Sequence, residues 1–320
     1  MNSKKQQKLT VIIPTFNVED MIARAIRSVS WADEIFVVDS FSTDRTRTIA
    51  RKHGARVVEH EYVYSAKQKN WAIPQAKNEW VLLLDSDEVV TPELKKTIQK
   101  LLCSDELESY DGFGIARKHF FLGKFLRWGG RYPLHNIRLF RTSCRYEDRD
   151  VHAHIILPKE RMKNITGDIL HYSDRDLAQY FEKFNRYTSW QANYMFKIYR
   201  DGMHNINLRE LFTNPYYAKA TVKDLWTFIP FTPIIRFFYM YILRLGFLDG
   251  RYGFMIALLY AFQDYVSKTK YLELRRHSPV VRLRMQGMMM RFFRALTEVR
   301  GDDLFAKNFH NNLSIIEAKK

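Results

Sequence analysis

Five consecutive apolar residues, Trp80 to Leu84, run directly into the acidic stretch Asp85-Ser86-Asp87-Glu88. A short continuous apolar run is typical of a strand that is buried on both faces, as in a parallel sheet. Charged groups are not left unpaired inside such a sheet, so we expect the acids to emerge at its carboxyl edge, where open α/β sheets bind ligands. Asp85 and Asp87 point the same way in an extended chain, and two such carboxylates suit Mg²⁺ or Mn²⁺ beside a diphosphate. The alternative interpretation is a solvated acidic turn that caps the next helix.

Apolar runs and stretches of helical spacing alternate through the first hundred residues. Strands are expected over Leu9–Thr15, Glu34–Asp39, Arg56–Glu59 and Trp80–Leu84. A helix is expected after each strand, and the last one has Thr91 as its N-cap and Pro92 at its first position. Crossover connections of this length join parallel strands. The sequence therefore predicts an α/β fold with a mostly parallel central sheet, whose residues 1–100 form a nucleotide-binding half.

The turn after the first strand excludes two common nucleotide-binding classes. It carries Pro14-Thr15-Phe16-Asn17, where a dinucleotide-dependent dehydrogenase would have G-x-G-x-x-G. A Walker-type phosphate loop is also missing from the sequence. Asp39 ends the second strand, and its carboxylate could cap the following turn or hydrogen-bond a base or ribose.

Residues 101–173 have the pattern of a second half of the same domain. Strands are expected there over four segments: Gly112–Phe121, Ile137–Arg141, Val151–Ile156 and Gly167–Ser173. An aromatic and glycine-rich loop, Trp128 to Pro133, lies between the first two of them. His152 and His154 would share one face of a strand, which could bind metal but is more often the polar face of an edge strand.

Residues 174–320 are expected to form a helical region rich in basic and aromatic side chains. The net charge of the chain is +16, of which +11 falls in residues 151–320, and this excess suits an anionic partner such as nucleic acid or an acidic lipid surface. Arginines mixed with aromatic residues are typical of a helix that lies in a membrane interface, although a packed helical subdomain would also fit. Cys103 and Cys144 form no metal or disulfide pattern and are expected to be reduced thiols in the cytoplasm.

Four motifs over residues 9–90 resemble family 2 glycosyltransferases with a GT-A fold: Val11–Asn17, Val37–Asp44, Lys69-Asn70 and Leu83–Glu88. A narrower likeness covers residues 120–275 and is similar to bacterial transferases of the lipopolysaccharide-core glucosyltransferase type and to enzymes of exopolysaccharide assembly. It rests on five short motifs: Tyr132-Pro133, Arg138–Arg141, Leu170-His171, Asn185–Tyr187 and Gly246–Gly250.

The resemblance implies roles for residues on both sides of the site. Nucleotide-binding residues would be Pro14, Thr15, Asn17, Asp39, Ser42, Lys69 and Asp85, with Asp39 on the base, usually uracil. Asp85, Asp87 and His171 would serve a divalent ion, Mg²⁺ or Mn²⁺, and Trp128, Arg138 and His152 would line the acceptor side. The family inverts the anomeric centre by one direct displacement, in which a carboxylate deprotonates the acceptor hydroxyl.

The catalytic base is where this chain departs from the family pattern. Close relatives tend to carry His-Glu-His where this chain has His152-Ala153-His154, and alanine cannot accept a proton. Glu147, Asp148 or Asp150 would then be the base, or the chain is a base-deficient form through natural divergence or engineering.

The resulting hypothesis is a metal-dependent, inverting transfer of a hexose from a nucleotide diphosphate sugar, with UDP as the expected nucleotide. The acceptor would be a glycolipid or lipid-linked saccharide of bacterial surface polysaccharide synthesis, and the enzyme would be cytoplasmic and peripheral on the inner face of the cell membrane. Two alternatives are a sugar-1-phosphate nucleotidyltransferase and a basic nucleotide- or nucleic-acid-binding protein without catalysis. The first would need a glycine-rich basic loop after the first strand, and the second shows no known nucleic-acid module.

Overall fold

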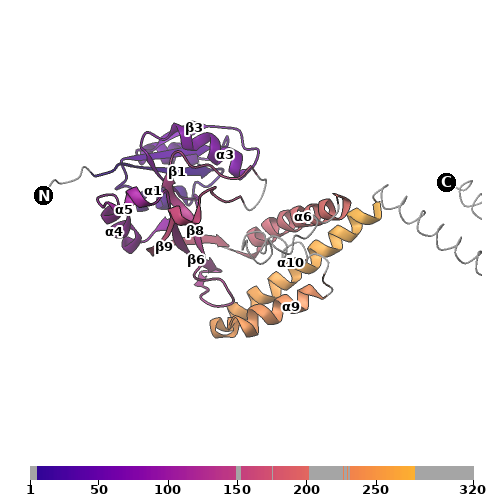
Figure 1. Ribbon diagram of the computed structural model, residues 1–320. Helices are drawn as coiled ribbons and strands as arrows, with labels where there is room; N and C mark the ends of the chain where they lie inside the picture. Colours follow the sequence, from indigo (N-terminus) through magenta and orange to yellow (C-terminus); the bar gives the residue numbers. More distant parts are fainter. Residues whose placement is uncertain are drawn as a thin grey trace, which may run out of the picture. The chain divides into compact units, whose positions relative to one another are not determined.

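The computed structural model describes residues 6–148, 153–174, 176–201, 226, 229 and 231–277. Figure 1 shows its helices and strands. The chain divides into two compact units. One comprises residues 1–181 together with 236–259, and the other comprises residues 182–235 and 260–320.

The first hundred residues form the expected parallel half-sheet, in the strand order β3-β2-β1-β4. Its strands are β1 (Leu9–Thr15), β2 (Glu34–Asp39), β3 (Arg56–Glu59) and β4 (Trp80–Leu83). The connecting helices are α1 (Ile22–Ser28), α2 (Thr46–Lys52) and α3 (Ser65–Ala72), which a 3₁₀ turn over Ile73–Gln75 extends. Thr15 pairs with Asp39 across β1 and β2, so the ends of these strands meet at one edge of the sheet.

The sheet continues beyond β4 in the order β8-β6-β9-β5, with β7 paired to β6. These elements are β5 (Glu88–Val90), α4 (Pro92–Leu101), α5 (Glu106–Ser109), β6 (Gly112–Phe121), β7 (Lys124–Phe125), β8 (His135–Arg141), a 3₁₀ turn over Lys159–Arg161, and β9 (Met162–Asp174). As expected, Thr91 caps α4, accepting the N–H of Leu94 on its hydroxyl.

The prediction of a mostly parallel sheet is wrong, because the sheet is mixed. β8 runs antiparallel to both β4 and β6, and β5 runs antiparallel to β9. The connection from β6 to β8 contains no crossover helix, so it reverses the chain into an antiparallel neighbour.

The strand expected over Val151–Ile156 is wrong for its described part, residues 153–156. This segment makes one isolated bridge, Tyr146 to Ile155, and backbone hydrogen bonds with Arg145 and Glu147. It therefore pairs with the chain just before it and adds no strand to the main sheet, because the short span between the two segments allows only a local hairpin.

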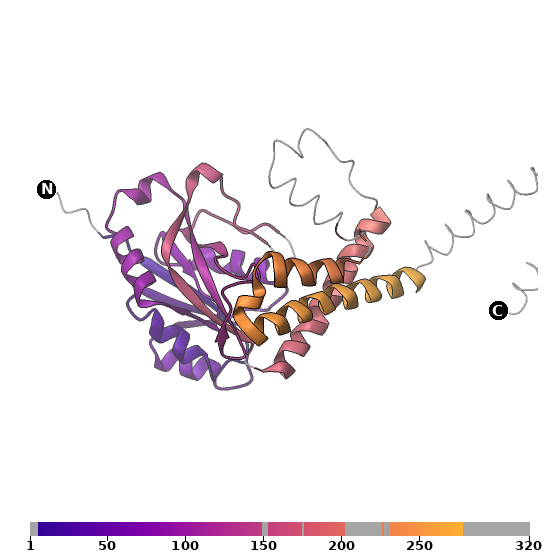
Figure 2. The ribbon, with the colours of Figure 1, turned by 90° about the horizontal axis from the view of Figure 1, so that it is seen from below.

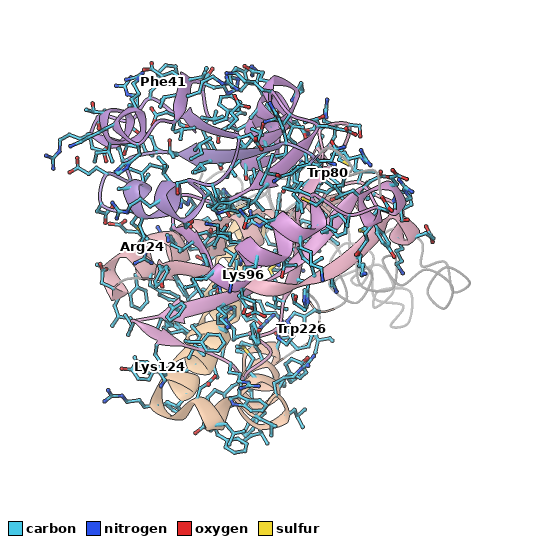
Figure 3. The ribbon with its side chains drawn as sticks, turned by 90° about the vertical axis from the view of Figure 1, so that its left-hand side faces the viewer. Arg24, Phe41, Trp80, Lys96, Lys124 and Trp226 are labelled. Carbon is cyan, nitrogen blue, oxygen red and sulfur yellow. The ribbon has the colours of Figure 1, made fainter. Side chains whose placement is uncertain are left out.

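Two apolar clusters lie on opposite faces of the parallel strands, since successive side chains of a strand point to opposite sides. Leu9, Val11 and Ile13 pack with the buried residues of α1 and α4, whereas Ile12 packs with those of α3. Figure 2 shows helices on both sides of the sheet. Figure 3 shows Trp80, which is fully buried, among the strands and Phe41 at the surface.

The remaining described elements are helical. They are α6 (Leu177–Asp201), α9 (Thr232–Phe238), a π-helical turn over Tyr239–Leu243, a 3₁₀ turn over Gly246–Asp249, and α10 (Gly250–His277). Among the described residues, none of the helices combines the length and apolar character needed to cross a membrane.

Candidate active site

The acidic stretch after β4 lies at the carboxyl edge of the sheet, as the sequence predicts. Asp85 and Asp87 are half-buried in the turn that leads into β5, and Glu88 begins that strand with no exposed surface. Asp85 Oδ2 accepts a hydrogen bond of 2.8 Å from Arg138 Nη2, and Asp85 Oδ1 lies 3.8 Å from Lys69 Nζ. Asp85 is therefore paired with two cations that come from β8 and α3.

Glu88 organises this group, a role that the residue pattern alone did not predict. Its carboxylate accepts from the backbone N–H of Asp85 at 2.9 Å, from Arg138 Nη2 at 2.9 Å and from Arg117 Nη1 at 3.2 Å. A buried carboxylate is stable only when its oxygens are paired in this way. The signal available in the sequence was its position, directly after Asp87 and before two β-branched valines.

Electrostatics favour the charged form of Asp85. Although burial alone would raise the pKa of Asp85, the guanidinium of Arg138 and the ammonium of Lys69 outweigh it and hold that pKa far below its ordinary value. Burial lowers the pKa of Lys69, and the carboxylate of Asp85 opposes this effect. The cluster therefore holds Asp85 as a carboxylate and surrounds it with positive charge.

Asp87 lies beside His171. Asp87 Oδ2 lies 3.3 Å from His171 Nε2, and His171 Nδ1 lies 3.0 Å from His119 Nδ1. The row is built by strand register, because His171 of β9 pairs with His119 of β6 on one side and with Glu88 of β5 on the other. His119 was missed by sequence reasoning, since only the register of β6 against β9 brings it to His171.

A chain of hydrogen bonds orients the two imidazoles. Arg117 Nε can only donate, so His119 Nε2, 3.1 Å away, accepts. Burial, reinforced by Arg131 and Arg117, lowers the pKa of the His119 imidazole. His171 is thereby held with its Nε2 toward Asp87.

The residues present fit a divalent ion whose coordination shell is completed by oxygen ligands of a substrate. Within the described parts of the chain, no three side chains of His, Cys, Asp or Glu converge as a complete protein-only metal site. Asp87 and His171 still offer one carboxylate and one imidazole side by side, a donor pair that Mn²⁺ or Mg²⁺ accepts when oxygen ligands come from a diphosphate. Asp85 pairs with Arg138 and Lys69, whereas Asp87 pairs with His171.

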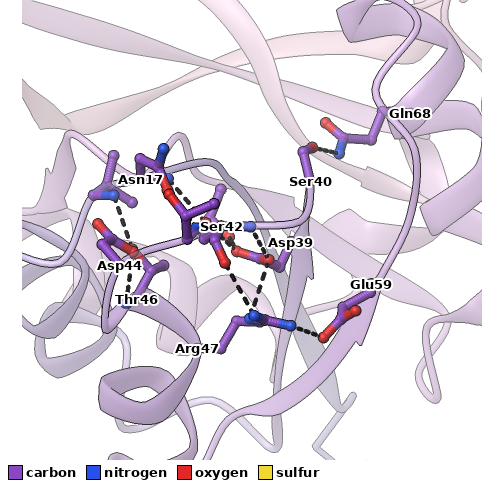
Figure 4. A network of polar contacts seen from close by, with 12 residues as sticks. Asn17, Asp39, Ser40, Ser42, Asp44, Thr46, Arg47, Glu59 and Gln68 are labelled. Carbon is purple, nitrogen blue, oxygen red and sulfur yellow. Dashed lines mark hydrogen bonds and ion pairs between the residues drawn. The ribbon is translucent and has the colours of Figure 1, made fainter.

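Asp39 lies at the end of β2 in a network that joins the first two strand ends (Figure 4). It is fully buried and accepts from Ser42 N at 2.8 Å, Ser42 Oγ at 2.6 Å and Thr15 Oγ1 at 3.1 Å. Asn17 ties the two loops together, because its N–H donates to Ser42 Oγ and its Oδ1 accepts from Thr43 N. The structure thus gives Asp39, Ser42, Thr15 and Asn17 a loop-ordering role, and their contact with a nucleotide, like that of half-buried Pro14, stays a prediction.

The segment that carries the candidate bases is fixed to α3. Asn70 bonds the backbone of Tyr146 twice, with its Nδ2 donating to the carbonyl at 2.9 Å and its Oδ1 accepting from the N–H at 2.8 Å. Glu147 follows and is half-buried, and exposed Asp148 accepts from the hydroxyl of Tyr64. Ala153 is half-buried against the apolar cluster on the α3 side.

The remaining predicted residues divide into three groups. Asp150 and His152 lie outside the described residues. Arg138, assigned to the acceptor, contacts Asp85 and Glu88 and therefore lies among the acidic residues after β4. Trp128 lies on the loop between β7 and β8, where its backbone N–H donates to Asp249 Oδ2 at 2.8 Å.

The sheet has a parallel half and a mixed half, and the carboxyl edge of the parallel half carries Asp39, Asp85 and Asp87. This is the arrangement of a GT-A-like glycosyltransferase. The model of the protein family described as Glycosyl transferase family 2 matches residues 10–174, just over half of the 320 residues. The chain therefore belongs to that family.

Two relatives of similar length are named glycosyltransferases. An uncharacterised glycosyltransferase of Rickettsia conorii is 28% identical over 284 residues, which is 85% of this chain and 93% of that protein. The lipopolysaccharide core biosynthesis glycosyltransferase LpsC of Rhizobium meliloti is 27% identical over 218 residues, 65% of this chain and 78% of LpsC.

Among solved structures, glucosyl-3-phosphoglycerate synthase of Mycobacterium tuberculosis is similar over 36% of this chain and 44% of its own. That structure contains Mn²⁺, UDP and glucosyl-3-phosphoglycerate, and the match has 25% identity and a TM-score of 0.30. The match to residues 1–349 of TarS of Staphylococcus aureus covers 81% of this chain and 91% of that one, with 18% identity and a TM-score of 0.38.

Proposed function

We propose that this glycosyltransferase moves a hexose from UDP to the hydroxyl of a glycolipid or lipid-linked saccharide, with inversion at the anomeric carbon. The observation that carries the proposal is the group at the carboxyl end of β4, where Asp87 pairs with His171 while Asp85 is held by Lys69 and Arg138. The relative LpsC, named for lipopolysaccharide core biosynthesis, supports the choice of acceptor class.

In this proposal each side chain has one task. Asp87 and His171 would hold Mn²⁺ or Mg²⁺, which when bound neutralises the charge of the leaving diphosphate. Lys69 adds a cation whose pKa is lowered by burial, and Arg138 fixes Asp85 toward the ribose. A carboxylate beside the acceptor, Glu147 or Asp148 among the described residues, would take the proton of the acceptor hydroxyl.

The location of the enzyme is part of the same proposal. A lipid-borne acceptor requires the active site to work at a bilayer, and the excess positive charge of residues 151–320 suits an anionic surface. We therefore place the enzyme on the inner face of the cell membrane.

The test is isothermal calorimetry of UDP with and without Mn²⁺, followed by product analysis with UDP-hexoses. Asp87→Asn should abolish the metal-dependent part of UDP affinity, whereas Asp105→Asn, a change of an exposed acid outside the site, should not. Release of UDP from a UDP-hexose fits the proposal, and formation of a nucleotide sugar from a sugar 1-phosphate would replace it by a nucleotidyltransferase. Metal-dependent UDP binding that survives in Asp87→Asn would remove the metal assignment.

A further inference from the structure

The segment Arg236–Leu259, called here the hairpin, belongs to the same compact unit as the sheet. It comprises the end of α9, the π-helical and 3₁₀ turns, and the start of α10. Aromatic rings join its two arms, since Phe254 lies with its centroid 5.7 Å from Phe237 and 5.6 Å from Tyr241. Gly253 permits the closest approach, because a Cβ there would lie 1.8 Å from the carbonyl oxygen of Gly246. The two arms of the hairpin are therefore packed directly against each other.

Large apolar side chains of the hairpin remain exposed despite this packing. The hairpin's exposed apolar set includes Phe238 at 55%, Ile242 at 46%, Leu243 at 73%, Phe247 at 43%, Leu248 at 53% and Leu258 at 50%. Single exposed apolar residues are ordinary on protein surfaces, but nine exposed large apolar or aromatic side chains on one hairpin of 24 residues mark an interaction surface.

The charges of the hairpin indicate what covers this set. Its 24 residues contain three arginines and one aspartate. Asp249 is engaged internally, because its carboxylate accepts the backbone N–H groups of Arg127 and Trp128. Arg244 and Arg251 are exposed and lie beside the rings of Tyr239 and Tyr252, at 5.3 Å and 5.0 Å. Exposed apolar residues flanked by arginine and tyrosine are the composition of an interfacial membrane anchor.

We propose that the hairpin inserts its exposed apolar set into the interfacial region of an anionic lipid bilayer, with Arg244 and Arg251 on the lipid headgroups. The hairpin also holds the loop that carries Trp128, through Asp249 and through the carbonyl of Arg244, which accepts the N–H of Gly129 at 2.8 Å. Membrane docking would thus fix the Trp128 loop at the bilayer surface. This second step rests on the proposed function, which requires a lipid-borne acceptor.

The test is flotation of the full chain with vesicles of phosphatidylcholine, with and without phosphatidylglycerol. The wild type should bind the anionic vesicles, and Leu243→Asp with Leu248→Asp should weaken that binding by at least about tenfold, since each leucine loses its apolar contact with the bilayer. Arg251→Gln should weaken it by about fivefold, the equivalent of about 1 kcal/mol per basic residue. Val63→Asp, which changes an exposed apolar residue on the loop between β3 and α3, should bind like the wild type.

Two alternative occupants are outcomes of the same experiment. A fluorophore at Leu243→Cys, on a Cys103→Ser background that removes the exposed native thiol, should report water without lipid and an apolar surrounding only with anionic vesicles. An apolar signal without lipid would overturn the proposal. If sedimentation velocity then shows a monomer, another part of the same chain covers the hairpin, and if it shows a dimer, a second copy of the chain does.

Calorimetry with UDP and Mn²⁺ in the absence of lipid separates the two proposals. Retained UDP binding with no vesicle binding would overturn the membrane surface alone. Vesicle binding without any UDP binding would overturn the proposed function and leave the surface standing.

Discussion

Asp39 is a buried carboxylate whose hydrogen bonds order a loop, and its contact with a ligand is a separate prediction. It is fully buried, and Ser42 and Thr15 donate all three hydrogen bonds that the structure gives to its oxygens. The sequence left open whether this residue caps the turn or contacts a base. The structure shows the first role, so a test of the second must remove the loop contribution.

Ser42→Ala supplies that control for Asp39→Asn. Both variants lose hydrogen bonds to the loop, and we expect each to lower the free energy of unfolding, by about 1.5–3 kcal/mol for bonds to a charged group. If Asp39 also contacts the base, Asp39→Asn should weaken UDP binding well beyond Ser42→Ala, as measured by calorimetry. Equal UDP affinities in the two variants would show that Asp39 orders the loop and does not contact the base.

Glu88 and Glu79 form ion pairs with arginines in opposite surroundings. Glu88 has no exposed surface and contacts Arg138 and Arg117, whereas the side chain of Glu79 is 56% exposed and contacts Arg141. Removing one partner of a buried pair leaves a charge without compensation, so Glu88→Gln should cost about 3–5 kcal/mol of unfolding free energy. Glu79→Gln should cost less than about 1 kcal/mol. Urea unfolding of both variants measures the difference, and equal costs would show that Glu88 does not organise the cluster.

Position 153 tests the origin of the catalytic base. If His152-Ala153-His154 replaces a family His-Glu-His, Ala153→Glu should raise turnover by about 10²–10⁴-fold and leave donor affinity unchanged. Steady-state rates with a UDP-hexose and acceptor measure this. Asp148→Asn is the counter-test, because loss of an existing activity in that variant would assign the base to Asp148. A flat turnover in Ala153→Glu would show that the family motif does not map onto this segment.

At the scale of elements, the sequence predicted the strands that are built around a continuous apolar run. Such runs lie at Val11–Ile13 in β1, at Ile35–Val38 in β2 and at Trp80–Leu84, and the crossover lengths predicted that these strands pair in parallel. The second half of the sheet could not be ordered in this way. The antiparallel pairing of β8 with β4 and the row Glu88–His171–His119 depend on register between distant strands, which tertiary packing sets and no local pattern reveals.

The same limit applies to the motif Gly246-Phe247-Leu248-Asp249-Gly250. Its resemblance to a subgroup was visible in the sequence, but its physical role was not. The structure shows that Gly246 lies against the backbone of Met240 and that Asp249 caps the backbone at Arg127 and Trp128. The motif is therefore a joint between the hairpin and the Trp128 loop.

This joint predicts the effect of a single methyl group. A Cβ at residue 253 would meet the backbone oxygen of Gly246, which cannot move as a side chain can, so Gly253→Ala should separate the two arms of the hairpin. Overpacking of this kind typically costs about 1–3 kcal/mol. Hydrogen exchange over residues 236–259 should accelerate in this variant and stay unchanged in Leu258→Ala, a change at an exposed position of the same helix. Unchanged exchange in Gly253→Ala would contradict the close packing.

At the scale of the whole molecule, charge and chemistry are unevenly distributed along the chain. Residues 1–150 carry a net charge of +5 and residues 151–320 carry +11, while Asp39, Asp85 and Asp87 all lie in the first part. In the proposed function, donor binding depends on contacts at the sheet edge, whereas attraction to an anionic surface depends on a field that salt can screen.

Salt should for this reason act on the two substrates differently. Raising the ionic strength from about 0.1 M to about 1 M shortens the Debye length from about 10 Å to about 3 Å, which screens exposed arginines from lipid headgroups. We expect the rate on an acceptor in anionic vesicles to fall with salt, because the enzyme leaves the surface on which the acceptor lies. Hydrolysis of the donor alone should change little, since Asp85, Lys69 and Arg138 interact at short range within the protein. A parallel loss of both rates would place the salt effect at the donor site and argue against a membrane-bound working state.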